Sequence, residues 1–196
     1  MKTKRVVAAG ALSIAICLPG VAIGQGLYVG GAIGSSNFRQ GCDGLPAGLS
    51  CKKTDSGWKG FAGYQFTPHW GVEVVGAEFG KAKANGSFLG IDTSGEARVW
   101  GGGIAGTGTL PLSKQFDLFG KLGVFHGVVE TSVNGGGVTV KESGHSNTAL
   151  VGAGARWNFS GNWAARLEWE RVNKMGDSTT GTSDADFISI GIEYRI

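Results

Sequence analysis

The sequence predicts an all-β fold, an eight-stranded antiparallel up-and-down transmembrane β-barrel, and three observations lead to this expectation. Eight segments rich in β-branched, aromatic and small residues follow one another along the chain. The connections between them alternate between long polar segments and tight turns. Aromatic residues gather where the strands meet the tight turns. Together these features are typical of a barrel that crosses a membrane.

The start of the chain has the pattern of a signal peptide. A short cationic head precedes an apolar run over residues 6–18, which is too short to span a bilayer as a helix. Small residues then lead to Gly24, after which we expect cleavage. The sequence is thus divided into a cleaved signal peptide, 1–24, and an outer-membrane barrel, 25–196. A membrane anchor that stays attached is the alternative.

The charge balance disfavours one class of partner. The signal peptide holds three of the 18 basic residues, and the remaining 15 face 15 acidic residues. No excess of basic residues is left to bind nucleic acid. We expect no metal site, because the three histidines, His69, His126 and His145, are scattered along the chain. We also expect no cofactor, because the GxGxxG pattern at 101–106 lies within a predicted strand and is not followed by a helix.

Two cysteines remain after the signal peptide, in the first long connection. Cys42 and Cys51 form an even pair in an exported chain, and the periplasm is oxidising. We therefore predict a Cys42–Cys51 disulfide that lies outside the bilayer.

The predicted strands cover residues 27–37, 57–66, 71–82, 97–110, 116–132, 148–159, 163–172 and 186–196. Long connections at 39–56, 83–95, 133–147 and 173–185 alternate with short ones at 67–69, 111–115 and 160–161. Outer-membrane barrels combine short periplasmic turns with long outer loops in this way. Within the strands, alternate residues are apolar, and we expect these to face lipid. A soluble sheet with its apolar face inward is the alternative.

The opposite faces of the strands carry charges that we expect in the lumen. An eight-stranded barrel is narrow enough for side chains to fill it, and charges away from bulk water must pair. We predict an ion-pair network that links Glu168 and Glu170 to arginines such as Arg156 and Arg166. The full predicted set is Lys59, Glu73, Arg98, Lys121, Arg156, Arg166, Glu168, Glu170, Glu193 and Arg195. Charges that merely sit solvated at the barrel ends are the alternative.

One acidic residue does not fit the apolar outer face. Strand alternation turns Glu78 toward lipid, close to the outer headgroups. A β-bulge at Gly76-Ala77 would also account for it.

Several segments resemble the OmpA/OmpX-type small outer-membrane barrels of Gram-negative bacteria. These are LYVGGAIG at 27–34, FAGYQF at 61–66, GAGARW at 152–157 and RLEWER at 166–171. The ending SIGIEYRI looks like the C-terminal signal that the barrel-assembly machinery reads, with Gly191, Tyr194 and Ile196 as its marked positions. It departs from the family in ending on Ile196, where Phe is usual. We expect no peptidoglycan-binding domain in this chain.

This resemblance implies an integral outer-membrane protein with a structural or weakly conducting, porin-like role. Adhesion or defence through the extracellular loops is the alternative. A lipid A-modifying enzyme is a further one, for which His126, His145 and Ser146 are the only catalytic candidates. The expected partners are outer-membrane lipid with lipopolysaccharide and the assembly machinery. We expect a monomer, although the sequence does not fix the oligomeric state.

Overall fold

The computed structural model describes residues 26–39, 50–88, 91–135, 138–177 and 181–196. These form nine strands: β1 (Gly26–Phe38), β2 (Ser50–Lys52), β3 (Thr54–Gln65), β4 (Trp70–Phe88), β5 (Ile91–Pro111), β6 (Phe116–Gly135), β7 (Val138–Ser160), β8 (Trp163–Asp177) and β9 (Gly181–Arg195). The predicted signal peptide lies outside the described residues. Within the described ranges, no helix is long and apolar enough to cross a membrane.

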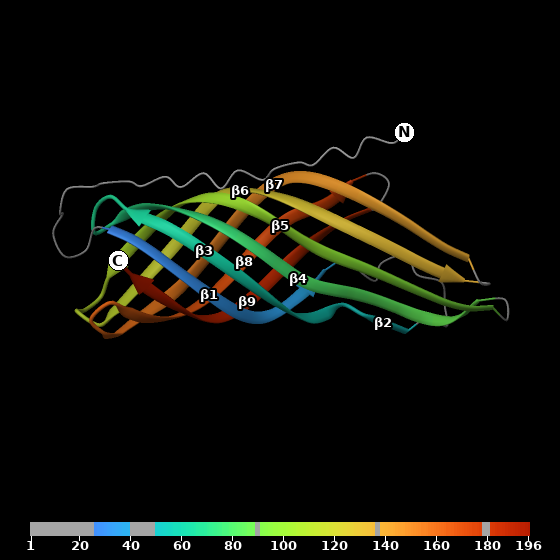
Figure 1. Ribbon diagram of the computed structural model, residues 1–196, viewed down its shortest axis with the longest axis horizontal. Helices are drawn as coiled ribbons and strands as arrows, with labels where there is room; N and C mark the ends of the chain where they lie inside the picture. The colour runs from blue at the N-terminus through green and yellow to red at the C-terminus, as the bar shows by residue number, and fades with distance from the viewer. Residues whose placement is uncertain (1–25, 40–49, 89–90, 136–137, 178–180) are drawn as a thin grey trace, which may run out of the picture.

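Eight of the nine strands close into a barrel (Figure 1). They follow the order β4-β3-β1-β9-β8-β7-β6-β5, and antiparallel pairing of β4 with β5 closes the ring. The short β2 pairs with the far part of β4 and takes no part in the closure. This confirms the predicted eight-stranded antiparallel barrel.

The short turns lie together at the end of the barrel that also holds the C-terminus (Figure 1). Two of them are built alike. In the β3–β4 turn, the Thr67 hydroxyl accepts hydrogen bonds from the backbone N–H groups of His69 and Trp70. In the β5–β6 turn, the Ser113 hydroxyl accepts the equivalent pair of bonds from Gln115 and Phe116. Such hydroxyl contacts fix tight turns locally, which is why four residues suffice in each turn.

The outer wall of the barrel is apolar and exposed, while the inner wall carries buried charges. Leu122 keeps 67% and Ile190 keeps 62% of their surface exposed, whereas Glu193 keeps none. A water-soluble sheet would place these residues the other way round. The arrangement instead suits a wall in contact with lipid.

Aromatic residues mark both edges of this apolar wall. Near the short turns they form stacked or tilted pairs, among them Phe116 with Trp157 and Trp163 with Tyr194. Toward the other end, Trp58, Trp100 and Trp169 are exposed. Two aromatic rings flanking an apolar band are expected at the two membrane–water interfaces. Because outer-membrane barrels have their short turns on the periplasmic side, the end with the short turns is periplasmic.

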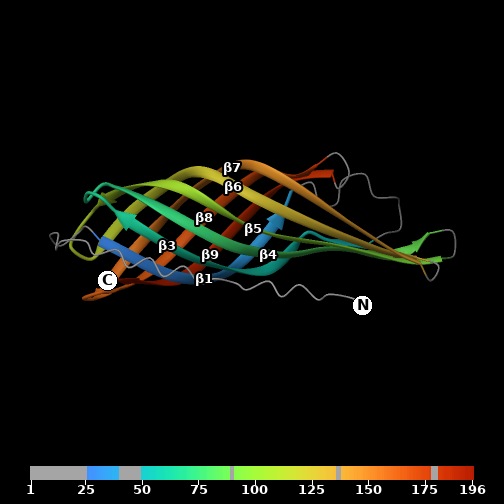
Figure 2. The ribbon, with the colours of Figure 1, turned by 45° about the horizontal axis from the view of Figure 1, so that its top comes forward.

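Several strands are longer than the sequence predicts. The segments 83–95 and 133–147, expected to be loops, mostly continue β4 and β5, and β6 and β7, as hairpins. As a result, the upper parts of β4–β7 project well beyond β1, β8 and β9 (Figure 2). The polar residues of these segments suggested loops, but strands above the membrane can be polar on both faces.

Glu78 faces outward as alternation predicts, and the alternative of a bulge at Gly76-Ala77 is wrong, although β4 does have a bulge farther along. The register between β4 and β5 shifts between Glu78 and Gly80, not at Gly76-Ala77. Gly80 takes a φ of +81°, and a Cβ there would lie 2.4 Å from the backbone oxygen of Ser56. This position therefore requires glycine. The Asp55 carboxylate accepts the N–H of Lys81 at 2.9 Å and completes the bulge.

Candidate functional site

The lower half of the lumen contains a layer of buried charges, which we call the charged layer. Its members come from β3, β4, β6, β7, β8 and β9, and each has an opposite charge within 4 Å. Four are basic and four acidic: Lys59, Lys121, Arg156 and Arg166 with Glu73, Glu168, Glu170 and Glu193. The layer is thus balanced in formal charge, as burial away from water demands.

Arg166 is the centre of the charged layer. Its guanidinium contacts Glu73 at 2.7 Å, Glu168 at 3.0 Å and Glu193 at 3.4 Å. The rings of Phe61 and Phe119 lie 4.4 and 4.2 Å from its central carbon. Contacts of this kind add a cation–π attraction to the ion pairs and confine the guanidinium to one plane.

The two lysines occupy the side of the layer away from the short turns. Lys59 contacts Glu168 at 2.5 Å and also contacts Glu170. Lys121 contacts Glu73 at 3.1 Å, Glu168 at 2.7 Å and Glu170. Glu168 thereby joins both lysines to Arg166. Glu170 pairs with the lysines rather than with arginines, which corrects one detail of the predicted network.

Arg156 extends the charged layer toward the periplasmic mouth. It contacts Glu193 at 3.1 Å and Asp117 at 3.7 Å, not Glu168 or Glu170 as predicted. Arg195 lies still nearer the mouth and is partly exposed, 3.3 Å from Glu193. The predicted Arg195 is therefore at the rim rather than inside the layer.

Arg98 is not in the lumen, and its prediction is wrong. Its side chain points outward, is 44% exposed and forms a two-bonded ion pair with Glu78, each bond 2.8 Å long. Alternation in β5 is in fact unbroken, with Val99 buried inward and Trp100 exposed outward. The glycine run at 101–103, which follows Arg98 in the sequence, obscured the phase of this alternation. Arg98 also shows how Glu78 is accommodated on the outer face.

A second layer, which we call the aromatic layer, fills the lumen above the charged one. Phe79 meets Phe125 and Phe187 edge to face, with ring centroids 5.6 and 5.4 Å apart. Phe187 is fully buried, as are the neighbouring Val172 and Ala185. Along β4, going away from the short turns, the inward side chains change from charged (Glu73) to aromatic (Phe79). The inward side chains of β6, β8 and β9 change from charged to apolar in the same direction.

Glycine provides the space for rings inside this narrow barrel. A Cβ on Gly63 would lie 2.2 Å from the ring of Tyr28, and one on Gly154 would lie 2.5 Å from the ring of Phe119. Both rings contribute to the charged layer: the Tyr28 hydroxyl donates to Glu73 at 3.1 Å, and Phe119 stacks on Arg166. The inward glycines are therefore positions of close packing.

A family model for the OmpA-like transmembrane domain matches residues 24–196. This chain belongs to that family. Outer membrane protein A of Yersinia pseudotuberculosis is 28% identical over 174 residues, which cover 86% of this chain and 48% of the relative. Outer membrane protein A of Klebsiella pneumoniae is 28% identical over 139 residues, covering 69% and 39%. The chain spans about half the length of the curated relatives it matches or less, and the relatives assign it to the outer membrane.

Solved structures resemble this OmpA-like barrel in fold. The attachment invasion locus protein Ail of Yersinia pestis has a TM-score of 0.52 and 19% identity, with 87% of this chain and 99% of that chain covered. Neisserial surface protein A has a TM-score of 0.54 and 12% identity, with 87% and 97% covered. Both are similar in backbone and too distant in sequence to transfer the role of a residue.

Other predicted positions of the OmpA-like barrel lie at its edges. Cys51 is in β2 and is disulfide-bonded; Cys42 lies outside the described residues, so the Cys42–Cys51 pairing stays a prediction. At the other end, Ile196 is exposed and the ring centroid of Tyr194 lies 4.8 Å from that of Trp163. Gly191 faces the backbone of β1. The function of these last three as an assembly signal also stays a prediction.

Sequence reasoning missed three groups of this OmpA-like barrel. Tyr28 and Asp117 were not expected in the lumen, although both are in phase with inward positions of their strands. The aromatic layer was also missed, because Phe79 follows Glu78 in a strand whose alternation seemed to break there. Among the described residues, no group of three or more His, Cys, Asp or Glu side chains could hold a metal ion.

Proposed function

We propose that this OmpA-like barrel is a structural outer-membrane protein whose lumen is closed to steady permeation. The observation that carries the proposal is the charged layer, in which eight buried side chains from six strands fill the cross-section and pair with one another. A solute would have to separate these pairs and leave charges uncompensated, at a cost of several kcal/mol for each. Weak conduction would require a rearrangement of the layer.

Recording in planar lipid bilayers tests this proposal. We expect the purified, refolded protein to give no steady current and at most small, intermittent openings. A large, steady, porin-like current from the unmodified barrel would overturn it. Arg171→Ala is a matched control, because Arg171 pairs with Asp186 on the outer face and takes no part in the lumen.

Adhesion through the extracellular end is the second candidate, and the projecting parts of β4–β7 favour it. They extend strand structure beyond the apolar wall, where it is accessible to other molecules. A similar fold occurs in a protein named for attachment and invasion. Shortening both hairpins, by removing residues 83–95 and 133–140, spares the paired parts of β6 and β7 below Lys141. This change should abolish cell adhesion without changing bilayer recordings. Unchanged adhesion would exclude this role.

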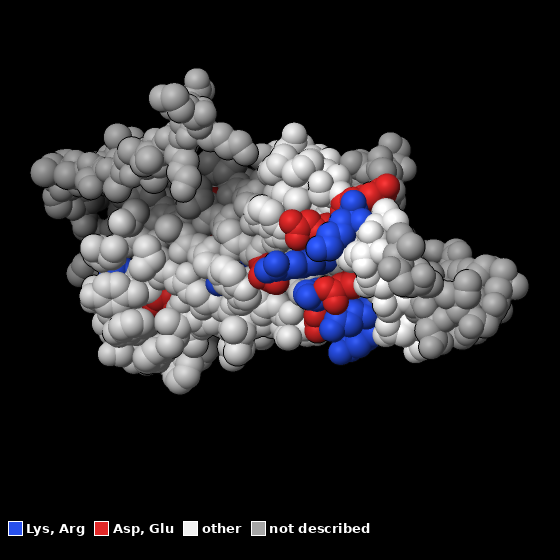
Figure 3. All heavy atoms as spheres, turned by 45° about the vertical axis from the view of Figure 1, so that its right-hand side comes forward, with Lys and Arg blue, Asp and Glu red and all other residues white. Residues whose placement is uncertain are grey.

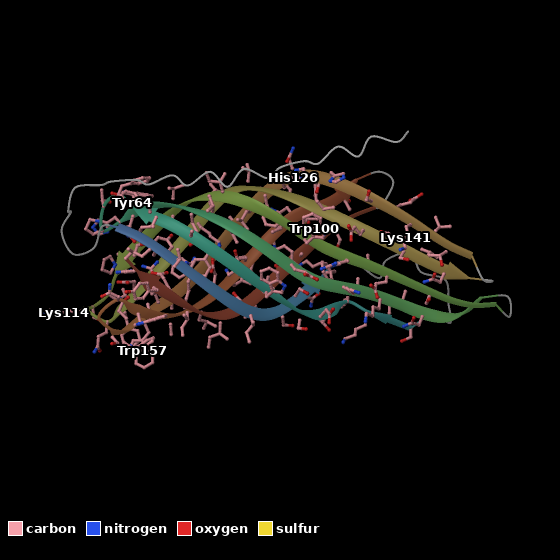
Figure 4. All side chains as sticks on the ribbon, viewed as in Figure 1. Tyr64, Trp100, Lys114, His126, Lys141 and Trp157 are labelled. Carbon is pink, nitrogen blue, oxygen red and sulfur yellow. The ribbon has the colours of Figure 1, made fainter. Side chains whose placement is uncertain are left out.

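We also propose that the outer face above the wall contacts lipopolysaccharide. Basic and acidic side chains gather there in one band (Figure 3), and they line a hollow of about 500 Å³. Lys81 and Lys141 are among its basic members. Cations at this height can pair with the phosphates of the outer leaflet. Lys81→Ala with Lys141→Ala should weaken lipopolysaccharide binding, while Lys114→Ala, at the opposite end (Figure 4), should not. Equal weakening in the control would refute the contact.

We propose further that the last strand guides assembly. Tyr194→Ala should slow barrel insertion in cells and leave refolding in detergent unchanged.

We also propose that the protein has no enzymatic role. Catalysis is disfavoured because His145 is exposed on the outer face, while the neighbouring Ser146 hydroxyl accepts the N–H of Gly176 at 3.1 Å. Adjacent strand residues point to opposite faces, so this histidine cannot activate this serine.

A further inference from the structure

Three polar side chains lie together on the outer face of β6 and β7. His126 is paired with Asn147 in the strand register, and His145 is paired with Val128. The two histidines are therefore diagonal neighbours, with ring centroids 5.9 Å apart and planes only 18° from parallel. Both are exposed. Like the Glu78–Arg98 and Arg171–Asp186 pairs, this patch places polar groups on an outer face that is otherwise mostly apolar.

The patch lies at the outer membrane–water boundary. Trp100, a member of the outer aromatic ring, is paired with Val128, the residue that faces His145. Figure 4 shows His126 and Trp100 at about the same height along the barrel, between the aromatic edge at Tyr64 and the projecting Lys141. Solutes from outside can therefore reach the two imidazoles without crossing the apolar wall.

Asn147 fixes the protonation pattern of His126. Its side-chain oxygen lies 2.8 Å from Nδ1 of the histidine, and an amide oxygen only accepts hydrogen bonds. In this arrangement Nδ1 carries the proton, and in the neutral ring Nε2 keeps its lone pair. Metal-binding histidines use the same arrangement, in which an oxygen acceptor on one ring nitrogen orients the other toward the ion.

We propose that His126 and His145 form a binding site for a divalent transition-metal ion of the Zn²⁺, Ni²⁺ or Cu²⁺ class. Imidazole nitrogen suits these ions, whereas Ca²⁺ and Mg²⁺ prefer oxygen ligands. Zinc binds histidine nitrogen at about 2.0–2.1 Å, so two nitrogens on one tetrahedral ion lie about 3.3 Å apart. With centroids 5.9 Å apart, the exposed rings must turn toward each other to hold one ion. The protein then supplies two ligands, and water completes the coordination.

Titration of Zn²⁺ alone into the tag-free, refolded protein in detergent micelles tests the site. We expect one Zn²⁺ per barrel, and at least a tenfold loss of affinity in His126→Ala and in His145→Ala. Asn147→Ala should weaken binding about tenfold, since loss of an outer-shell acceptor typically costs 10–100-fold. His69→Ala is the matched control: His69 lies at the periplasmic end, 3.2 Å from the backbone oxygen of Thr109, and its loss should change nothing. Mg²⁺ should not compete.

Two results would overturn the proposal. One is wild-type protein that binds no Zn²⁺; the other is binding that survives removal of both His126 and His145. Nitrogen NMR of the metal-free protein provides an independent check. It should show His126 protonated at Nδ1 with Nε2 free, and Asn147→Ala should remove this preference. The opposite tautomer in the wild type would contradict the argument even if zinc bound elsewhere.

Discussion

The charged and aromatic layers fill the same narrow lumen in different ways. In the charged layer each side chain has particular partners, and Glu168 alone joins Arg166, Lys59 and Lys121. In the aromatic layer, Phe79, Phe125 and Phe187 meet by shape and edge-to-face contact. The first layer specifies which strands face one another, while the second excludes water above it. The two layers lie in series, so either one alone should keep the barrel closed.

The largest expected effect follows from removing the centre of the charged layer. Arg166→Ala leaves three carboxylates without their shared cation, and breaking a buried ion pair in this way costs about 3–5 kcal/mol. Urea unfolding in detergent micelles measures this loss. Combined with Glu168→Ala, the total loss should be smaller than the sum of the two single losses, because the Arg166–Glu168 pair is lost in each single variant and is counted twice in their sum. Strictly additive losses would show that the pairs act independently.

A slightly smaller effect is expected in the aromatic layer. Phe187→Ala removes a fully buried ring that packs against Phe79, and such a cavity costs about 3 kcal/mol. Phe159→Ala, in the exposed periplasmic girdle, is the control and should cost much less. If the layers are seals in series, neither Phe187→Ala nor Arg166→Ala alone gives a steady current in bilayers, but the double variant does. A steady current from one single variant would assign the whole seal to that layer.

Most members of the charged layer could be predicted from the sequence. The positions and pairings that could not be predicted have physical reasons. Alternation placed Lys59, Glu193 and the other members of the charged layer inward, because one face of each strand had to be apolar. The prediction failed at Arg98, because the glycines at 101–103 obscure the phase of an alternation that itself runs unbroken through β5. Periodicity also gives the face of a residue but not its partner. For that reason the pairing of Glu170 with lysines could be recognised only once the strands were placed around the closed barrel.

The bulge itself gives a third, smaller prediction. Gly80→Ala places a side chain at a φ of +81° and against the backbone of Ser56, which should cost about 1–2 kcal/mol. Gly76→Ala, in the same strand, is the matched control, because nothing lies within 4 Å of its added Cβ. Urea unfolding compares the two variants. If the bulge moves instead, the register between β4 and β5 changes above Glu78, which loss of the Glu78–Arg98 contact in an NMR spectrum would reveal.

The smallest effect concerns the pH dependence of the same bulge. The hydrogen bond from the Lys81 N–H holds the pKa of the Asp55 carboxyl below its usual range, and this outweighs the small opposing effect of desolvation. Because the folded pKa is lower than the unfolded value of about 3.9, the stabilisation is fully present above that value. It is lost as the pH falls through the folded pKa.

A carboxyl-carbon NMR titration should therefore place the Asp55 midpoint below that of an unfolded aspartate. In Asp55→Asn, a weaker neutral acceptor replaces the carboxylate, so hydrogen exchange at the Lys81 amide should be faster at neutral pH and lose its acid dependence. An ordinary Asp55 midpoint, or Lys81 exchange that is the same in both proteins, would show that the glycine alone maintains the bulge.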